Sequence, residues 1–299
     1  MRGPDIERES ARAPANHRTR RELGAFFAAV FVVTWGLGAL IIFARPQLEA
    51  LIGPIGIVNQ HWLYFIAVSA PTMCAAVIAA VSGRMAGLRE LLMSLLRPAQ
   101  LKWWAVAIFA YPVGLLVYGL LERALGARND VDMHALLITA PTMAVTTLVL
   151  FSDPGALGEE LGWRGFALPR LLRLCNGATA AIVLGVLWAT WHVPAFLVEG
   201  LSQATFNFGW FLLGLVSLSV LMTWIFVHAN GSALVAGVLP HAILNLTFDA
   251  HVFKVVPKTQ AIVLAIIAAL ILAVFGPSLR GWQVSAPHPR RDLPNQGAA

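Results

Sequence analysis

Long runs of apolar residues, separated by short polar connections, dominate the sequence. The first uncharged run, Leu23–Phe43, contains 21 residues, and a helix needs about 20 apolar residues to cross a bilayer. This run exceeds the apolar core of about 7–15 residues in a signal peptide, so it predicts a retained transmembrane helix. Together the apolar runs predict helices at about residues 23–43, 62–81, 103–121, 139–168, 179–198, 208–228, 232–248 and 260–275.

The composition also predicts a protein with several transmembrane helices. Hydrophobic residues make up 58% of the chain and charged residues only 12%, whereas soluble domains carry about 25% charged residues. We therefore predict an all-α, polytopic helical bundle of about eight transmembrane helices in the cytoplasmic membrane. Polar residues 1–22 predict a disordered tail, residues 23–275 the bundle with its motif-bearing core at about 139–250, and residues 276–299 a second polar tail.

Basic residues concentrate in alternate connections and in both tails. The positive-inside rule therefore predicts that both termini are cytoplasmic, although Lys254 and Lys258 fall on the other side. The net charge of +6 thus indicates membrane orientation, and nucleic-acid binding is not expected. The segment Leu88–Leu96 is amphipathic and predicts a piece that lies on the membrane surface.

The polar cluster Glu159, Glu160 and Arg164 lies inside an apolar helix that Pro154 interrupts. Charged residues in such helices are costly, and they indicate function unless they are paired. Glu160 and Arg164 have the i,i+4 spacing of a helical ion pair, which predicts a structural role for those two residues. Glu159 lies about 100° away around the helix and has no such neighbour in sequence. It is therefore the candidate functional carboxylate.

Two later helices supply possible partners. His192 follows Trp188 by one turn, and His241 and Asn245 share one face of their helix. The alternative for each is an ordinary hydrogen bond to a carbonyl or to a neighbouring helix. Counted at 1.5 Å per residue from the predicted helix ends, Glu159, His192 and His241 fall near one level. That level is mid-membrane or in the cytoplasmic half, so we expect the clusters to form a single site.

The residue types fit the hydrolysis of an amide bond. A buried glutamate suits a general base that activates water, and histidine or asparagine can donate hydrogen bonds to a developing oxyanion. A divalent metal such as zinc on Glu159, His192 and His241 is a second interpretation, which the spacing does not specifically support. The sequence contains neither an HExxH motif nor a rhomboid-like GxSG motif.

The three clusters, in this order, resemble the motifs of the CPBP family, the CAAX proteases and bacteriocin-processing enzymes, which include the type II CAAX prenyl endopeptidases. The matching residues are Glu159, Glu160, Arg164, Trp188, His192, His241 and Asn245. Trp188 stands where phenylalanine is usual, and both residues are aromatic. The resemblance makes Glu160, Arg164 and Trp188 supporting residues.

The resemblance implies an intramembrane endopeptidase that cleaves a membrane-associated peptide or protein. It assigns the activation of water to Glu159 and the positioning of water to His192. His241 and Asn245 would stabilise the oxyanion. The family was long described as metalloproteases, so the resemblance leaves both a metal-dependent and a glutamate-dependent mechanism open.

Two other functions are compatible with the sequence. A non-catalytic membrane protein, such as a bacteriocin immunity factor or a peptide-binding scaffold, could carry the same motifs. A transporter with Glu159 as its proton site would predict a repeated second half with matching broken helices, and the sequence contains no such repeat.

Overall fold

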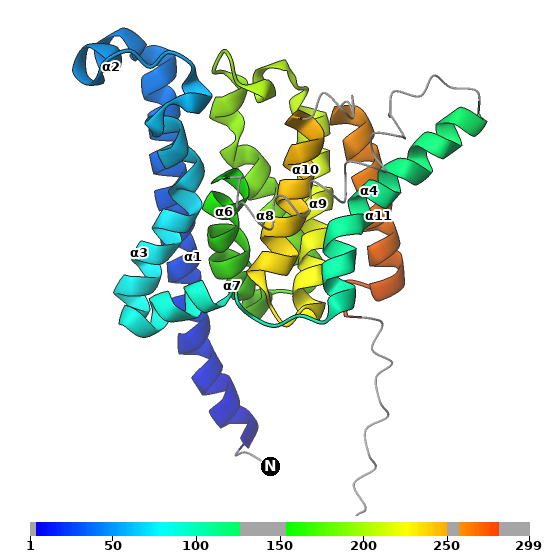
Figure 1. Ribbon diagram of the computed structural model, residues 1–299. Coiled ribbons are helices and arrows are strands. Elements are labelled where there is room, and N and C mark those ends of the chain that lie inside the picture. Colours follow the sequence, from blue (N-terminus) through cyan, green and yellow to red (C-terminus); the bar gives the residue numbers. More distant parts are fainter. Residues whose placement is uncertain (1–3, 126–153, 250–256, 281–299) are drawn as a thin grey trace, which may run out of the picture.

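The chain forms a bundle of helices (Figure 1). The computed structural model describes residues 4–125, 154–249 and 257–280, and no strand occurs within these ranges. The α-helices are α1 Pro4–Phe43, α2 Arg45–Ile52, α3 Trp62–Met93, α4 Leu101–Ala124, α6 Pro154–Glu160, α7 Leu168–Leu174, α8 Gly177–Trp191, α9 Phe208–His228, α10 Leu239–Asp249 and α11 Pro257–Phe275. Two π-helices, η2 Leu161–Ala167 and η5 Leu234–Val238, and three 3₁₀ turns, η1 Val58–Gln60, η3 Val193–Phe196 and η4 Ser202–Thr205, complete the described elements.

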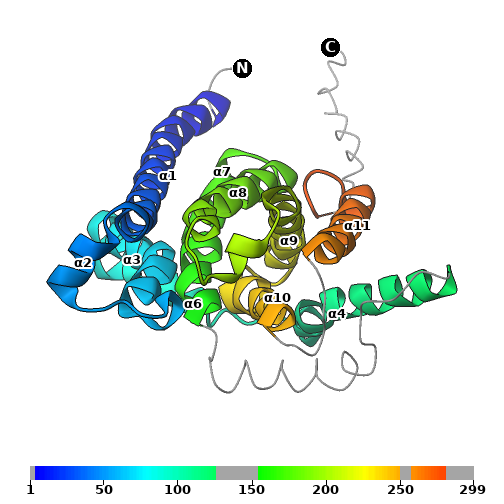
Figure 2. The same ribbon diagram turned by 90° about the horizontal axis from the view of Figure 1, so that it is seen from above.

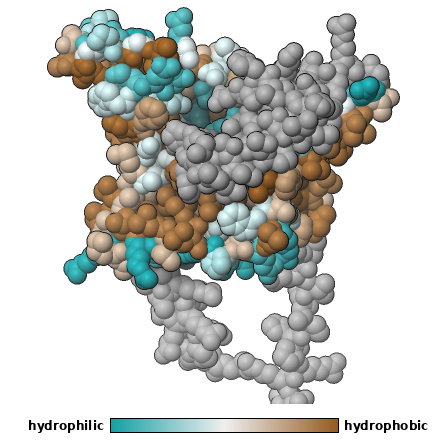
Figure 3. All heavy atoms as spheres, in the orientation of Figure 1, coloured by the Kyte–Doolittle hydropathy of each residue, from teal (hydrophilic) through white to brown (hydrophobic). Residues whose placement is uncertain are grey.

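The described helices have the length and apolarity of membrane spans. Five are long enough, at Asn16–Phe43, Trp62–Met93, Leu101–Ala124, Phe208–His228 and Pro257–Phe275, and Gly177–Trp191 and Leu234–Asn245 are shorter apolar helices. On the face that Figure 3 shows, apolar residues form a broad band, and hydrophilic groups gather near the two ends. The prediction of an all-α, polytopic membrane bundle is confirmed. The first part of the helix predicted at 139–168 lies outside the described residues.

Helix α1 is longer than the first predicted span. The sequence predicted a disordered tail over residues 1–22, whereas the helix begins at Pro4. Glu22 explains part of this extension, because its carboxylate accepts hydrogen bonds from Arg18 one turn before it and from Arg170 on α7, at 2.9 and 2.8 Å. The polar stretch is therefore helical in part because its charges pair along the helix and with the bundle.

Helix α3 turns sharply near one end of the bundle. Arg84 has φ = 53°, a left-handed conformation that interrupts the helix between the predicted span and the predicted amphipathic segment. The guanidinium of Arg18 donates a hydrogen bond to the carbonyl of Ser82, beside this turn. Figure 1 shows the following piece running across the end of the bundle where α1 begins.

The motif-bearing helices occupy the centre of the molecule. Viewed from above, α6, α8, α9 and α10 surround a central region, with α1 and α3 on one side and α4 and α11 on the other (Figure 2). Trp163, Arg164 and Trp188 are among the largest fully buried side chains. The ion pair of Glu160 and Arg164 and its aromatic neighbours therefore lie in the buried interior of the fold.

Candidate active site

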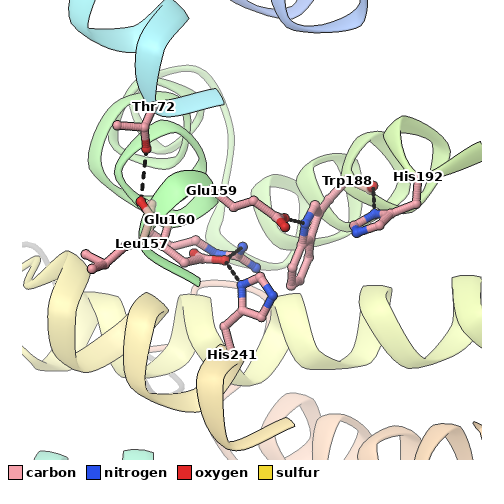
Figure 4. Close-up of polar contacts among 8 residues, drawn as sticks. Thr72, Leu157, Glu159, Glu160, Trp188, His192 and His241 are labelled. Carbon is pink, nitrogen blue, oxygen red and sulfur yellow. Dashed lines mark hydrogen bonds and ion pairs between the residues drawn. The ribbon is translucent and has the colours of Figure 1, made fainter. Parts of the chain in front are cut away.

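A tightly packed π-helix holds the two glutamates in place. Helix α6 ends at Glu160 and continues directly into the π-helix η2, a rare element that is often found at functional sites. Gly162 lies so close to α3 that a Cβ atom there would overlap the backbone carbonyl group of Pro71. The hydroxyl of Thr72 donates a hydrogen bond to the carbonyl of Leu157 at 3.1 Å (Figure 4). Contacts with α3 thus fix the position of the α6–η2 segment.

Glu160 joins two other motif residues in a buried network. Its Oε1 accepts a hydrogen bond from the Arg164 guanidinium at 2.8 Å and lies 2.8 Å from Nδ1 of His241. Glu160 and Arg164 are fully buried and His241 almost so. The predicted i,i+4 ion pair is confirmed. Gly237 leaves room for this carboxylate, because a Cβ atom there would lie 2.8 Å from Oε2 of Glu160.

Glu159 points away from this network and toward α8. Its Oε2 accepts a hydrogen bond of 2.6 Å from the indole Nε1–H of Trp188, as Figure 4 shows. The ring of Trp188 also contacts the network around Glu160, because the guanidinium of Arg164 lies over this ring at 4.3 Å from its centre. Trp188 therefore contacts both Glu159 and Arg164, the ion-pair partner of Glu160. The sequence predicted an aromatic supporting residue but not this hydrogen bond.

His192 is placed by the end of a helix. The sequence predicted a helix over 179–198, and that prediction is wrong at its C-terminal end, because α8 stops at Trp191 and His192 is its cap. Pro194 is the physical reason, since proline lacks the N–H that would continue the helical hydrogen bonds. Trp191 is tied to α1, because its indole N–H donates to the hydroxyl of Thr34 at 2.8 Å. The residues next to Trp191 in the sequence do not indicate this contact with α1.

The hydrogen bonds assign the same tautomer to both histidines. Nδ1 of His192 lies 2.9 Å from the carbonyl oxygen of Trp188, which can only accept a hydrogen bond. Oε1 of Glu160 accepts from Arg164 and serves as the acceptor for His241 as well. Nδ1 therefore carries a hydrogen in each ring, and Nε2 is a hydrogen-bond acceptor whenever the imidazole is neutral.

The predicted residues meet at a single cavity of about 490 Å³. Glu159, Trp188, His192, His241 and Asn245 all contribute to its lining. The carboxylate of Glu159 is buried, with the residue only 4% exposed. The expectation that the three clusters form one site is confirmed as a matter of geometry. Depth in a membrane and the role of each residue stay predictions.

Glu159, His192 and His241 are residue types that can bind a metal ion. Over the residues that the structure describes, no three His, Cys, Asp or Glu side chains lie close enough together to hold a metal ion. Glu159 and His241 instead make hydrogen bonds with Trp188 and Glu160. The predicted set of Glu159, His192 and His241 therefore does not fit a metal centre in this arrangement.

The fold and site define a helical, membrane-type protein with a buried carboxylate and two histidines beside an internal cavity. Comparison with known proteins narrows this class. Residues 141–247 match the family described as "Type II CAAX prenyl endopeptidase Rce1-like". This segment is therefore similar to the CAAX proteases, and the resemblance drawn from the motifs is confirmed.

A curated relative supports the same family. The chain is 29% identical over 123 residues to "CAAX prenyl protease 2" of Methanococcus maripaludis. The match covers 38% of this chain and 44% of the relative. The chain thus matches less than half the length of that protein.

Proposed function

We propose that the protein is an intramembrane endopeptidase that hydrolyses a peptide bond in a membrane-associated peptide or protein. The observation that supports this most directly is the meeting of Glu159, His192, His241 and Asn245 at one cavity. The family match over residues 141–247 supports a protease of this kind. The cavity volume of about 490 Å³ lies in the range of known ligand sites, about 300–1,000 Å³.

The proposed mechanism uses the side chains of the chain itself. Glu159 takes a proton from a water molecule as the water oxygen attacks the carbonyl carbon of the substrate. His192 orients that water by accepting a hydrogen bond from its second hydrogen at Nε2, and His241 lies beside them in the cavity lining. The carbonyl oxygen becomes an oxyanion, to which the side-chain amide of Asn245 donates a hydrogen bond. Glu159 then passes its proton to the leaving nitrogen as the carbon–nitrogen bond breaks.

The other motif residues have a supporting role in this proposal. Trp188 holds the carboxylate of Glu159 toward the cavity, and Glu160 fixes the ring of His241. Arg164 neutralises the buried charge of Glu160. Removing one partner of such a buried pair leaves a charge without compensation, so these residues are expected to be sensitive to substitution.

The test compares the wild type with Glu159→Gln and with Glu49→Gln, a matched change at a glutamate on α2 outside the cavity. Each purified protein is incubated with membrane-anchored peptides, some carrying a C-terminal lipidated cysteine, and products are identified by mass spectrometry. We expect Glu159→Gln to lower cleavage about 10²–10⁴-fold, the usual contribution of a general base. Glu49→Gln should cleave at the wild-type rate.

Two outcomes would contradict the proposal. Unchanged cleavage by Glu159→Gln would show that this glutamate takes no part in the reaction. Peptide binding without products from any variant would favour the non-catalytic scaffold. Repeating the assay with a chelator distinguishes a glutamate-dependent mechanism from a metal-dependent one. The glutamate-dependent reaction should continue when metal ions are removed.

A further inference from the structure

Three residues of α1 contact the chain just before and just after His192. Two of them bond to Trp191 and the third packs on Pro194, and the three are Thr34, Trp35 and Gly38. They fall within little more than one turn, so a single stretch of α1 makes all of these contacts. Helix α1 lies outside residues 141–247, the segment that the family match covers. The placement of His192 thus involves a helix that the motifs do not include.

The end of α8 leaves a backbone carbonyl for α1 to bind. In a continuous helix the carbonyl of Trp191 would accept the N–H of Ala195, four residues later. Here that N–H donates to the carbonyl of His192 instead, at 2.9 Å. The indole N–H of Trp35 donates to the Trp191 carbonyl at 3.3 Å. A side chain of α1 therefore supplies a hydrogen bond that the end of α8 lacks.

A second hydrogen bond holds the side chain of Trp191. Its indole N–H donates to the hydroxyl oxygen of Thr34 at 2.8 Å, and that hydroxyl donates to the carbonyl of Ala67 on α3 at 3.1 Å. Both bonds form at once, because a hydroxyl has one hydrogen to donate and lone pairs to accept with. The ring of Trp191 packs edge-on against the ring of His192, with 4.6 Å between their centres. The position fixed by Thr34 is thus passed on to the histidine.

Gly38 brings α1 against the proline that follows α8. A Cβ atom on Gly38 would lie 2.6 Å from Cβ of Pro194, so a side chain here would push the two segments apart. Both residues line the cavity, as do Thr34 and His192. The contacts of α1 therefore reach the wall of the cavity that contains Glu159.

We propose that Thr34 and Trp35 are positioning residues for His192, which makes α1 part of the active site. By binding the side chain and the carbonyl of Trp191, they hold the following residue where Nε2 of its ring accepts a hydrogen bond from the attacking water. These contacts of Thr34 and Trp35 with Trp191 are called the α1 clamp. The inference rests on the proposed function for the role of His192, whereas the clamp itself can be tested without any substrate.

Conservative substitutions remove each hydrogen bond of the α1 clamp separately. Thr34→Val removes the hydroxyl but keeps the shape of the side chain, Thr34→Ser keeps the hydroxyl, and Trp35→Phe removes the indole N–H. Trp104→Phe on α4 is the matched control. Helices α1 and α4 lie on opposite sides of the bundle (Figure 2), and Trp104 does not line the cavity. Thermal unfolding of each purified variant in detergent shows whether it is folded.

Hydrogen–deuterium exchange tests the α1 clamp in the absence of substrate. The segment to follow is residues 188–197, which contains the end of α8 and η3. We expect Thr34→Val and Trp35→Phe to exchange about 3- to 10-fold faster in this segment, as the loss of one hydrogen bond between neutral groups predicts. Thr34→Ser and Trp104→Phe should exchange at the wild-type rate. Unchanged exchange in both Thr34→Val and Trp35→Phe would overturn the proposal.

Cleavage kinetics test whether the α1 clamp acts through His192. We expect Thr34→Val and Trp35→Phe to lower kcat about 3- to 10-fold with KM unchanged, because the water is misplaced and the peptide is not. Thr34→Ser should restore the wild-type kcat. In a His192→Gln background the same two changes should lower kcat by less than about 2-fold, since residues that act through one group are not additive.

Two kinetic results would contradict the positioning role. One is faster exchange with a wild-type kcat, which would make the α1 clamp structural only. The other is a loss in the His192→Gln background as large as in the wild type, which would mean that α1 acts independently of this histidine. Absence of cleavage by the wild type would instead contradict the proposed function, and the exchange rates would still decide whether the clamp exists.

Discussion

At the scale of single residues, Trp188 connects the parts of the site. Its indole N–H bonds to Glu159, its ring lies under Arg164 and its carbonyl bonds to His192. Phenylalanine at this position would keep the ring and the carbonyl but lose the N–H donor. The hydrogen bond is therefore the feature that distinguishes this site from one built with phenylalanine.

The substitution Trp188→Phe isolates that hydrogen bond. Hydrogen bonds to charged groups contribute about 1.5–3 kcal/mol, so we expect kcat/KM to fall by roughly 10- to 100-fold. Comparison of kcat/KM with the thermal unfolding temperature separates a positioning role from a loss of folding. Trp191→Phe is the matched control, because it removes a hydrogen bond to Thr34 instead. Equal losses of activity in the two variants would argue against a special role for Trp188.

At the scale of elements, close backbone contact positions the glutamates. The π-helix η2 packs on α3 at Gly162, where no side chain fits. The sequence predicted the residues of the site because unpaired polar groups are costly inside apolar helices. It did not predict η2, η5 or the end of α8 at Trp191, because these features depend on packing between helices and on the proline that follows. Nor did local spacing reveal the bond between Glu159 and Trp188, which are far apart in the chain.

The substitution Gly162→Ala tests this contact. A Cβ atom would overlap the backbone of Pro71, and overpacking typically costs about 1–3 kcal/mol. We expect a lower unfolding temperature in detergent, together with lower activity as Glu159 shifts. Gly36→Ala on α1 is the control, because no atom lies within 4 Å of its added methyl group. A Gly162→Ala protein as stable and active as Gly36→Ala would contradict the proposed positioning by η2.

At the scale of the whole molecule, Glu22 links the first helix to the motif-bearing half. The two arginines that it binds, Arg18 and Arg170, come from α1 and α7. Arg18 also donates a hydrogen bond to α3, so the three helices are connected near the end of the bundle where α1 begins. Neither Glu22 nor either arginine lines the cavity.

The substitution Glu22→Gln tests that link. Partly exposed ion pairs contribute up to about 1 kcal/mol, so we expect a small loss of stability, greatest at low ionic strength. Thermal unfolding over a series of salt concentrations measures it. Activity of the folded protein should stay at the wild-type level, because Glu22 does not line the cavity. A loss of activity without loss of stability would show that α1 acts on the site directly.

The shared tautomer of the two histidines also bears on how a cleaved product leaves. Hydrolysis replaces a neutral carbonyl with a carboxylate. That new anion would face the carboxylate of Glu159 and the Nε2 lone pairs of His192 and His241, with no lysine or arginine among the described lining residues. Like charges repel, and acceptors without hydrogens cannot bind an anion. In the proposed reaction, the arrangement that prepares water for attack would therefore also favour release of the acid product.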